Sequence, residues 1–418
     1  MKVYKFGGAS VKDPSGIRNL AKIVSAEKGD LVIVVSAFGK TTNALEKVLN
    51  TWFKDDNGWK DHLDNIYSYH ISMAEELFSA NDPVRNLIDN SFGALKEYLS
   101  QEMKSVYDYE YDQIVSYGEI WSTLIVSEYL NRNGLNVKWV DIRTKLVTDD
   151  RYRDANILWG ESYLRIRPAF DLSEYPFFLT QGFIGATIAG QTTTLGREGS
   201  DYTAAILATI LDAESVTFWK DVPGLLNADP KWLPDGQKLE QVSYREAVEM
   251  TFSGAKVIHP KTIKPLHNRN IPLHVKSFID PREPGTLITE EPELKKIIPV
   301  FIRKENQVLL SLLPKDFSFV MGDNLSRIFQ SFMQHGIKVN IVDASAVSIN
   351  VCIDDERLKI NDLLNDLKDE YSAVYNENVE MLSVRHYTPA AVERITEGRE
   401  ILLEQRSRSM VRFVTRKV

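Results

Sequence analysis

The sequence contains very little cysteine, and this excludes several classes of protein. Cys352 is the one cysteine among 418 residues, so neither an internal disulfide framework nor a cysteine-rich metal site is available. The seven histidines do not occur at the close spacing of zinc ligands. We therefore predict no metal site of the protein's own and a reducing compartment, the cytoplasm.

Long apolar runs and an excess of positive charge are also missing. The run at residues 31–38 is far too short to span a bilayer, and the chain starts with a strand-like segment rather than a signal peptide. Lys and Arg number 50 against 58 Asp and Glu, which gives a net charge of −8. This balance argues against nucleic-acid or anionic-membrane binding. At about 150 residues per domain, the length suggests two or three domains.

The start of the chain has the pattern of a βαβ unit. Residues 3–6 predict a strand, and residues 14–27 predict a helix with one apolar face. Residues 31–35 form a continuous, mostly β-branched run, which is typical of a parallel strand buried on both faces. An opening βαβ unit predicts an α/β fold with a right-handed crossover. Residues 43–133 look mostly helical.

The pattern changes after a turn-rich segment at 280–293. Two short strands, at 307–313 and 347–353, flank a predicted helix at about 323–335, which indicates a compact regulatory module. Beyond it we expect charged helices at 356–370 and about 389–405 and a last strand at 410–415. The basic run that ends the chain is either an anion site or an edge strand protected by charges.

Several motifs at predicted strand ends suit the binding of anions. Lys5 precedes Gly7 and Gly8, whose backbone amides can approach an anion closely. Neither the G-x-G-x-x-G fingerprint nor the P-loop pattern is present, and a plain turn with a solvated lysine explains this motif equally well when it is taken alone. The loop at 36–43 suits a small polar substrate or is an ordinary hydrophilic loop. Glu119 either accepts from a substrate ammonium group or is a helix N-terminal charge.

A more specific block occupies residues 192–204, where three threonines, Arg197, small residues and Asp201 precede a predicted helix. A Gly-rich loop at a helix N-terminus binds anions, and an arginine fork suits a carboxylate or phosphate. Either Ser200 or Asp201 is expected to cap the helix. Lysines and aspartates follow at 219–231 and 253–260, where a nucleotide with its metal would fit.

In this order the motifs resemble those of aspartokinases, of the amino-acid kinase family. The resemblance rests on residues 5–11, 118–119, 180–185, 192–204, 221–224 and 254–260. It implies an α/β fold, a three-layer αβα sandwich followed by an α+β ACT-like regulatory domain. The implied catalytic domain is 1–295, with an aspartate lobe at about 1–180 and a nucleotide lobe at about 181–295. The implied regulatory region is 296–418, with an abbreviated second module.

The resemblance implies ATP-dependent phosphorylation of the L-aspartate side chain to 4-phospho-L-aspartate, at the entry to lysine, threonine and methionine biosynthesis. Mg²⁺ would be bound mainly through the ATP phosphates. The acceptor carboxylate is ionised at neutral pH, so no general base is needed. The obstacle is repulsion between two anions, which positive groups must offset.

The resemblance also implies roles for individual residues. Lys5 is the catalytic cation and Asp201 orients it. The substrate would be held by Ser36, Thr42, Glu119, Arg197 and Ser200. The phosphates and nucleotide would be held by Gly7, Gly8, Lys220, Asp221, Leu226, Lys231, Lys256 and Val257. At 220 and 226 the family admits other residue types.

The regulatory region is expected to bind an amino-acid effector through Asp323, Leu325 and Ser345, and to form a homodimer or a higher homo-oligomer. Lysine-sensitive relatives have a Ser-Glu pair where this sequence has Ser345 and Ala346, so we predict weak lysine inhibition. Two other functions stay open. One is a kinase for a related acidic amino acid, and the other is a catalytically silent amino-acid sensor.

Overall fold

The computed structural model describes residues 1–101, 105–255, 258–293, 297–316, 318–320 and 322–417. The chain divides into two compact units, which are treated separately below. The first comprises Met1–Leu225, Lys238–Val248 and Val257–Glu293, and the second comprises Leu226–Gln237, Glu249–Lys256 and Leu294–Val418.

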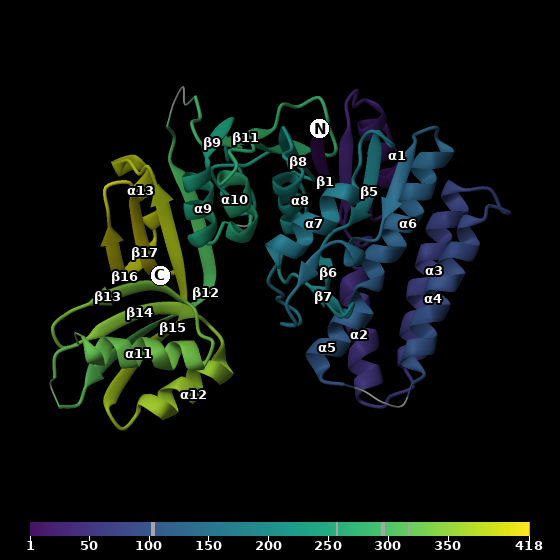
Figure 1. Cartoon of the computed structure of the whole chain (residues 1–418). Helices are drawn as coiled ribbons and strands as arrows, with labels where there is room; N and C mark the ends of the chain where they lie inside the picture. The colour runs from purple at the N-terminus through teal and green to yellow at the C-terminus, as the bar shows by residue number, and fades with distance from the viewer. Residues whose placement is uncertain (102–104, 256–257, 294–296, 317, 321, 418) are drawn as a thin grey trace. The chain divides into compact units, whose positions relative to one another are not determined.

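Figure 1 shows the elements that the chain forms as far as residue 293. They are β1 (Lys2–Phe6), α1 (Pro14–Ser25), β2 (Leu31–Val35), α2 (Thr41–Phe53), α3 (Trp59–Leu77), α4 (Val84–Leu99), α5 (Tyr107–Val115), α6 (Tyr117–Arg132), β3 (Val137–Val140), the 3-10 turn η1 (Ile142–Thr144), β4 (Val147–Thr148), α7 (Trp159–Ala169), β5 (Phe177–Gln181), β6 (Ile184–Thr187), β7 (Thr192–Thr194), α8 (Gly199–Ile210), β8 (Ser215–Lys220), β9 (Gln241–Ser243), α9 (Tyr244–Phe252), α10 (Pro260–His267), β10 (Leu273–Ser277) and β11 (Thr286–Thr289).

The main sheet of the first unit has the strand order β3-β5-β2-β1-β8-β10-β11-β9. Neighbouring strands run parallel except β10 and β11. All five residues of β2 are fully buried, which confirms the prediction from its continuous apolar run. The strands β4, β6 and β7 form a second, smaller sheet.

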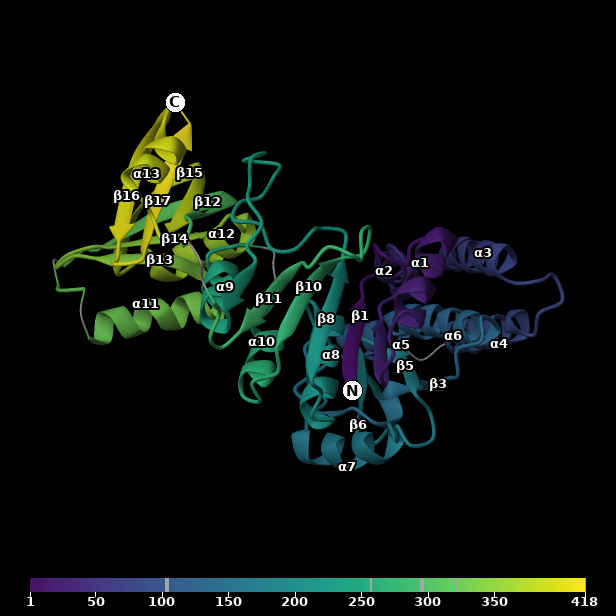
Figure 2. The ribbon, with the colours of Figure 1, turned by 90° about the horizontal axis from the view of Figure 1, so that it is seen from above.

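Helices cover both faces of the main sheet. Leu31, Ile33 and Val35 share one core with residues of α1, α2, α3, α4 and α6. Because side chains alternate along a strand, Val32 and Val34 face the other way, where α8 contacts β1, β2 and β8. Figure 2 shows α1 and α7 on opposite sides of β1. The predicted helical character of 43–133 is also confirmed, since α2 to α6 fill this stretch.

The second unit contains an antiparallel sheet with three helices. Its elements are β12 (Val300–Pro314), α11 (Asp323–Gln334), β13 (Val339–Ala344), β14 (Ile349–Asp354), α12 (Arg357–Leu367), β15 (Tyr371–Arg385), α13 (Pro389–Thr396), β16 (Arg399–Arg406) and β17 (Met410–Lys417). The strand order is β13-β14-β12-β15-β17-β16. Residues of α11 and α12 pack on one half of the sheet, and residues of α13 pack near the other half.

The structure corrects two expectations in this unit. The predicted helix at 389–405 is wrong beyond Thr396, because Gly398 adopts a left-handed φ of 67° and the chain continues as β16. The last strand, β17, is not at the sheet edge but between β15 and β16. Two arginines of the basic run form ion pairs with nearby glutamates: Arg406 pairs with Glu404, and Arg416 pairs with Glu400.

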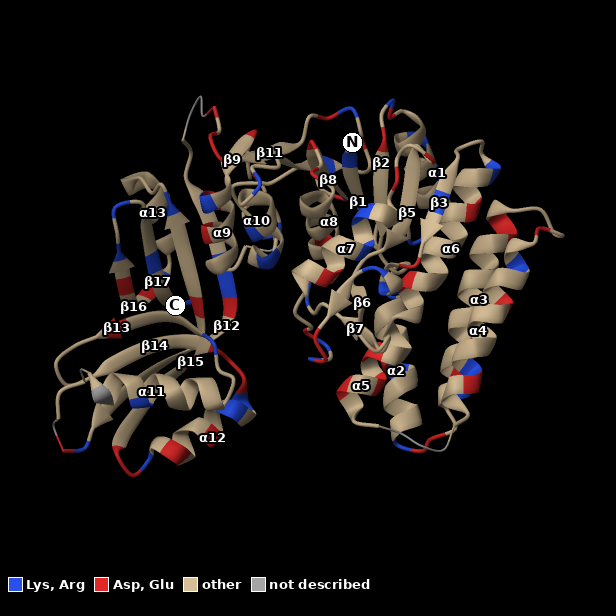
Figure 3. Cartoon of the chain, viewed as in Figure 1, with Lys and Arg blue, Asp and Glu red and all other residues tan. Residues whose placement is uncertain are grey.

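Charges of both signs are interspersed along the described elements of each unit (Figure 3). In the part of the chain that the structure describes, no helix is both long and apolar enough to cross a membrane.

Candidate active site

A pocket of about 580 Å³ opens in the first unit where β1 and β2 end. Carboxyl ends of parallel strands are the usual place for ligands in open α/β sheets. The pocket is lined by Lys5, Gly8, Ser36, Ala37, Gly39, Thr42, Tyr111, Glu119, Arg153, Phe183, Gly196, Arg197, Glu198, Gly199, Ser200, Asp201 and Lys220.

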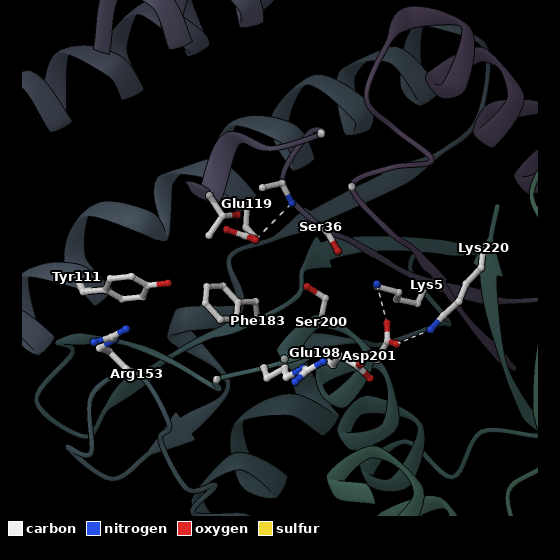
Figure 4. A pocket seen from close by; sticks show the side chains of 17 residues that line it. Lys5, Ser36, Tyr111, Glu119, Arg153, Phe183, Glu198, Ser200, Asp201 and Lys220 are labelled. Atoms are coloured by element: carbon white, nitrogen blue, oxygen red, sulfur yellow. Dashed lines mark hydrogen bonds and ion pairs between the residues drawn. The ribbon is translucent and has the colours of Figure 1, made fainter. Parts of the chain in front are cut away.

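One end of the pocket carries a buried carboxylate between two lysines. The Lys5 Nζ lies 2.6 Å from Asp201 Oδ1, and the Lys220 Nζ lies 3.3 Å from Asp201 Oδ2 (Figure 4). Burial alone would raise the pKa of Asp201, but the ammonium groups of Lys5 and Lys220 outweigh it and hold this pKa below its ordinary value. Asp201 is therefore an anion that fixes the Lys5 ammonium at the end of β1.

The loops that follow β1 and β2 are joined by backbone hydrogen bonds. The Ser36 amide donates to the Phe6 carbonyl at 3.1 Å, and the Gly39 amide donates to the Gly8 carbonyl at 3.0 Å. A Cβ at Gly8 would lie 2.5 Å from the Ala37 carbonyl oxygen. Only glycine permits this approach, which explains the second glycine of the motif. Lys5 and Ser36 therefore lie on the same side of the pocket.

Glu119 is a second buried carboxylate, in a different environment. Its Oε1 accepts from the Ala37 amide at 3.4 Å, while its Oε2 is buried without a hydrogen-bond partner among the described residues. Burial raises the pKa of Glu119 to about 8, and the Ala37 amide and Lys5 only partly oppose this. Its unpaired oxygen in a cavity wall suits a donor from a ligand, such as an ammonium group.

The block at 192–204 forms β7, a tight loop and the start of α8. A Cβ at Gly182 would lie 2.4 Å from the Cβ of Ser200, so a glycine at the end of β5 lets α8 begin close to the strand. The expected capping by Ser200 or Asp201 is wrong. The N-cap is Glu198, which makes no side-chain cap bond and has a φ of 55°, because the Asp201 side chain pairs with the lysines instead.

Arg197 projects into the pocket as a free cation. It makes no hydrogen bond or ion pair with any described residue, and it is exposed. An unpaired guanidinium fork in a pocket wall suits a ligand carboxylate or phosphate.

The pocket brings together most of the residues proposed from the sequence. It unites Lys5, Gly8, Ser36, Thr42, Glu119, Arg197, Ser200, Asp201 and Lys220.

Other predicted site residues lie elsewhere. Gly7 adjoins the Lys5 Nζ but does not line the pocket, and Asp221 is exposed beyond β8. Leu226 and Lys231 belong to the second unit. Lys256 and Val257 lie outside the described residues.

The proposed effector residues belong to the second unit. Leu325 lies on α11, and the Ser345 hydroxyl lies 2.8 Å from the Ser348 hydroxyl just after β13. Asp323 begins α11, but its side chain lies outside the described part of the structure.

Sequence reasoning missed several lining residues, including Tyr111, Arg153, Phe183 and Glu198. In Figure 4, Tyr111 and Arg153 lie at the end of the pocket opposite Lys5. Arg153, Phe183 and Glu198 all adopt left-handed φ values, which are uncommon outside glycine and cluster at functional sites. Of these residues, only Arg153 could have been suspected from the sequence, because it is an arginine in the charged loop 149–154.

Comparison with known proteins identifies the family. The model of the amino acid kinase family matches residues 1–277. The chain belongs to this family. Lysine-sensitive aspartokinase 3 of Escherichia coli is 33% identical over 359 residues, which cover 84% of this chain and 78% of that protein. Aspartokinase 1 of Arabidopsis thaliana chloroplasts is 30% identical, with 87% and 65% covered.

A longer relative is the chloroplastic bifunctional aspartokinase/homoserine dehydrogenase 2 of Arabidopsis thaliana. It is 30% identical, and the match covers 88% of this chain but only 42% of that protein.

Solved structures agree with this assignment. Aspartokinase III of E. coli, in complex with aspartate and ADP, matches with a TM-score of 0.83 and 29% identity over 99% of this chain and 96% of that chain. Clostridium acetobutylicum aspartate kinase matches with a TM-score of 0.81 at 20% identity, over 99% and 96%, and shows the fold alone. The predicted fold class is confirmed, and the chain is a kinase of the aspartokinase type.

Proposed function

We propose that this chain transfers the γ-phosphoryl group of ATP to the side-chain carboxylate of L-aspartate, giving 4-phospho-L-aspartate and ADP. This is the first step of lysine, threonine and methionine biosynthesis. The observation that carries the proposal is the pairing of Lys5 and Lys220 with the buried Asp201 in a pocket that also holds Glu119 and Arg197. The match to an aspartokinase solved with aspartate and ADP supports it.

Each of these residues has a separate role in the proposed reaction. The aspartate carboxylate oxygen forms the new bond to phosphorus, and the bond to the oxygen bridging to ADP breaks. Lys5, held by Asp201, neutralises charge that develops on the transferred group. Glu119 binds the substrate ammonium group, and Arg197 binds its α-carboxylate. No proton has to be removed from the acceptor, because a carboxylate is ionised at neutral pH.

The residues fit a magnesium ion that arrives with ATP. No group of three or more His, Cys, Asp or Glu side chains within the described ranges is arranged to hold a metal ion, and Asp201 is already paired with two lysines. Mg²⁺ is commonly held through substrate phosphates and water. When bound, it supplies further neutralisation of the phosphate charge.

The regulatory part of the proposal follows the family. A catalytic domain at 1–295 precedes a regulatory region at 296–418, in which α11 and the turn after β13 bind an amino-acid effector. The chain forms a homodimer or a higher homo-oligomer through this region, and it works in the cytoplasm. The sizes of species in solution, measured by light scattering with and without amino acids, test the assembly.

Trapping of the acyl phosphate tests the reaction. The full chain is given ATP, Mg²⁺ and hydroxylamine with either aspartate or glutamate. We expect hydroxamate from aspartate and little from glutamate. Hydroxamate from glutamate alone would identify a kinase for another acidic amino acid, and none from either would identify a silent sensor. Both outcomes contradict the proposal.

A further inference from the structure

A second hollow, of about 370 Å³, lies in the first unit between α2 and α3, which pack against each other. It is lined by Lys40, Thr41, Ala44 and Lys47 on one side and by His62, Asn65, Ile66 and Tyr69 on the other. These positions recur at intervals of three or four residues, so each helix turns one face toward the hollow. The small side chain of Ala44 faces the gap and leaves it unfilled.

The hollow has an apolar base and a polar rim. Thr41 and Ile66 are buried, whereas Lys40, Lys47 and Asn65 are exposed. A ligand that fills it would rest an apolar body on the base and keep a polar group at the rim, the usual division in small-molecule sites.

The rim carries the positive charges of Lys40 and Lys47, which form no ion pair with a described residue. The side chains of Lys40, Lys47 and His62 make no ion pair or hydrogen bond with any described residue, and no carboxylate lines the hollow. Helix α2 begins at Thr41 without a side-chain cap, so its first amides add positive partial charge on the same side. The arrangement is complementary to an anion.

We propose that this hollow binds a small organic anion, with its phosphate or carboxylate group between Lys40, Lys47 and His62 and an apolar body against Ile66. The site is separate from the catalytic pocket, and the observations that indicate it do not rest on the proposed reaction. It nevertheless adjoins the same turn, because Gly39 and Thr42 line the catalytic pocket while Lys40 and Thr41 line the hollow.

Tyr69 strengthens this connection between the two cavities. Its hydroxyl donates to the Lys12 carbonyl at 2.5 Å, and a Cβ at Gly39 would lie 3.3 Å from the same hydroxyl. A ligand that contacts Tyr69 can therefore shift the turn that carries Thr42. We expect it to change the KM for the amino-acid substrate more than kcat.

Calorimetric titration of the full chain with phenyl phosphate or benzoate tests the site, with benzyl alcohol as the uncharged probe. The diagnostic variant is Lys47→Gln/His62→Gln. The matched control is Lys54→Gln, which removes a lysine just beyond the far end of α2. Arg197→Gln reports on anion binding in the catalytic pocket. Thermal unfolding establishes that each variant is folded, and no readout of binding depends on turnover.

At the hollow we expect one anion per chain, with affinity weakened about tenfold or more in Lys47→Gln/His62→Gln by the loss of charge-assisted contacts. Affinity should be unchanged in Lys54→Gln and Arg197→Gln. Tighter binding of phenyl phosphate identifies a phosphate ligand, and tighter binding of benzoate identifies a carboxylate. Equal affinity in the diagnostic variant, an equal loss in Lys54→Gln, equal binding of benzyl alcohol, or no binding at all would overturn the proposal.

Discussion

Asp201 and Glu119 are both buried carboxylates in one pocket, but their surroundings give them opposite properties. Two ammonium groups surround Asp201 and lower its pKa, whereas Glu119 has one amide donor and a raised pKa of about 8. The first is a permanent anion that holds Lys5. The second becomes an anion only at higher pH or when a cation binds next to it.

The protonation state of Glu119 predicts how kcat/KM for aspartate depends on pH. Below about pH 8 the free enzyme holds Glu119 as a neutral acid, which must lose its proton before it can pair with an ammonium group. We expect kcat/KM for aspartate to fall by about tenfold per pH unit below this value. The profile is measured at saturating ATP.

Two variants make this prediction specific. Glu119→Gln should lower kcat/KM at high pH by about tenfold or more and remove the acidic limb of the profile. Glu128→Gln, on the same helix but outside the pocket, should keep the wild-type profile. An unchanged acidic limb in Glu119→Gln would assign the titration to another group.

Individual site residues differ in how far the sequence alone could locate them. Lys5, Arg197 and Asp201 sit in motifs whose residue types and order suggest anion chemistry. Phe183 and Glu198 reach the pocket because their backbones adopt left-handed φ values, which no residue type at those positions indicates. Such contacts depend on how distant segments meet, and local patterns do not encode this.

Helices α3 and α6 support the pocket through an aromatic cluster around a histidine. His70 is fully buried, and its ring stacks on Phe38 at 5.6 Å and packs against Phe92 and Trp121. Its Nδ1 donates to the Ile66 carbonyl at 2.8 Å. Phe38 belongs to the loop that follows β2, so the cluster packs against the turn at 39–42 that lines the candidate active site.

Burial lowers the pKa of His70 to about 4, so the fold holds this ring neutral. Because the pKa is lower in the folded state, the contribution to stability is complete above the unfolded value near 6.5 and declines as the pH falls toward 4. Between about pH 7.5 and 5 this costs about 2 kcal/mol. We expect His70→Phe to reduce the loss of unfolding free energy over this range by that amount, as measured by urea denaturation.

Ser68→Ala, which changes an exposed residue that does not titrate on the same helix, should keep the wild-type dependence. An identical pH dependence in His70→Phe would show that the ring is not held neutral by the fold.

Strands and helices were predictable where burial or turns leave a local pattern. The unbroken apolar run of β2 indicated a strand covered on both faces, and the structure confirms it. The segment at 399–406 was mistaken for helix because its charged residues suit either state. Its pairing with β17 decides the outcome, and pairing between separate segments outweighs local propensity.

The first unit has a sheet of mostly parallel strands and holds the candidate active site, and the second unit has an antiparallel sheet for which we propose a regulatory role. Matches to aspartokinases cover most of the chain, and the resemblance implies a glutamate in lysine-sensitive relatives where this sequence has Ala346. Lysine carries an ammonium group on its side chain, and a carboxylate at this position would pair with it.

We therefore predict weak inhibition by lysine. Ala346→Glu should raise lysine sensitivity by about tenfold, as measured by the concentration that halves activity. Ala390→Glu, which adds the same charge on α13, should change nothing. Strong lysine inhibition of the unmodified chain would refute the role assigned to this position.

The most direct test of the account is the rate of hydroxamate formation from aspartate in Lys5→Ala, with Lys2→Ala on the same strand as control. Circular dichroism establishes that both variants are folded. We predict a loss of about a thousandfold or more in Lys5→Ala, because the cation that stabilises the transferred phosphoryl group is gone, and a rate close to wild type in Lys2→Ala. A folded Lys5→Ala protein that forms hydroxamate at the wild-type rate would contradict the account.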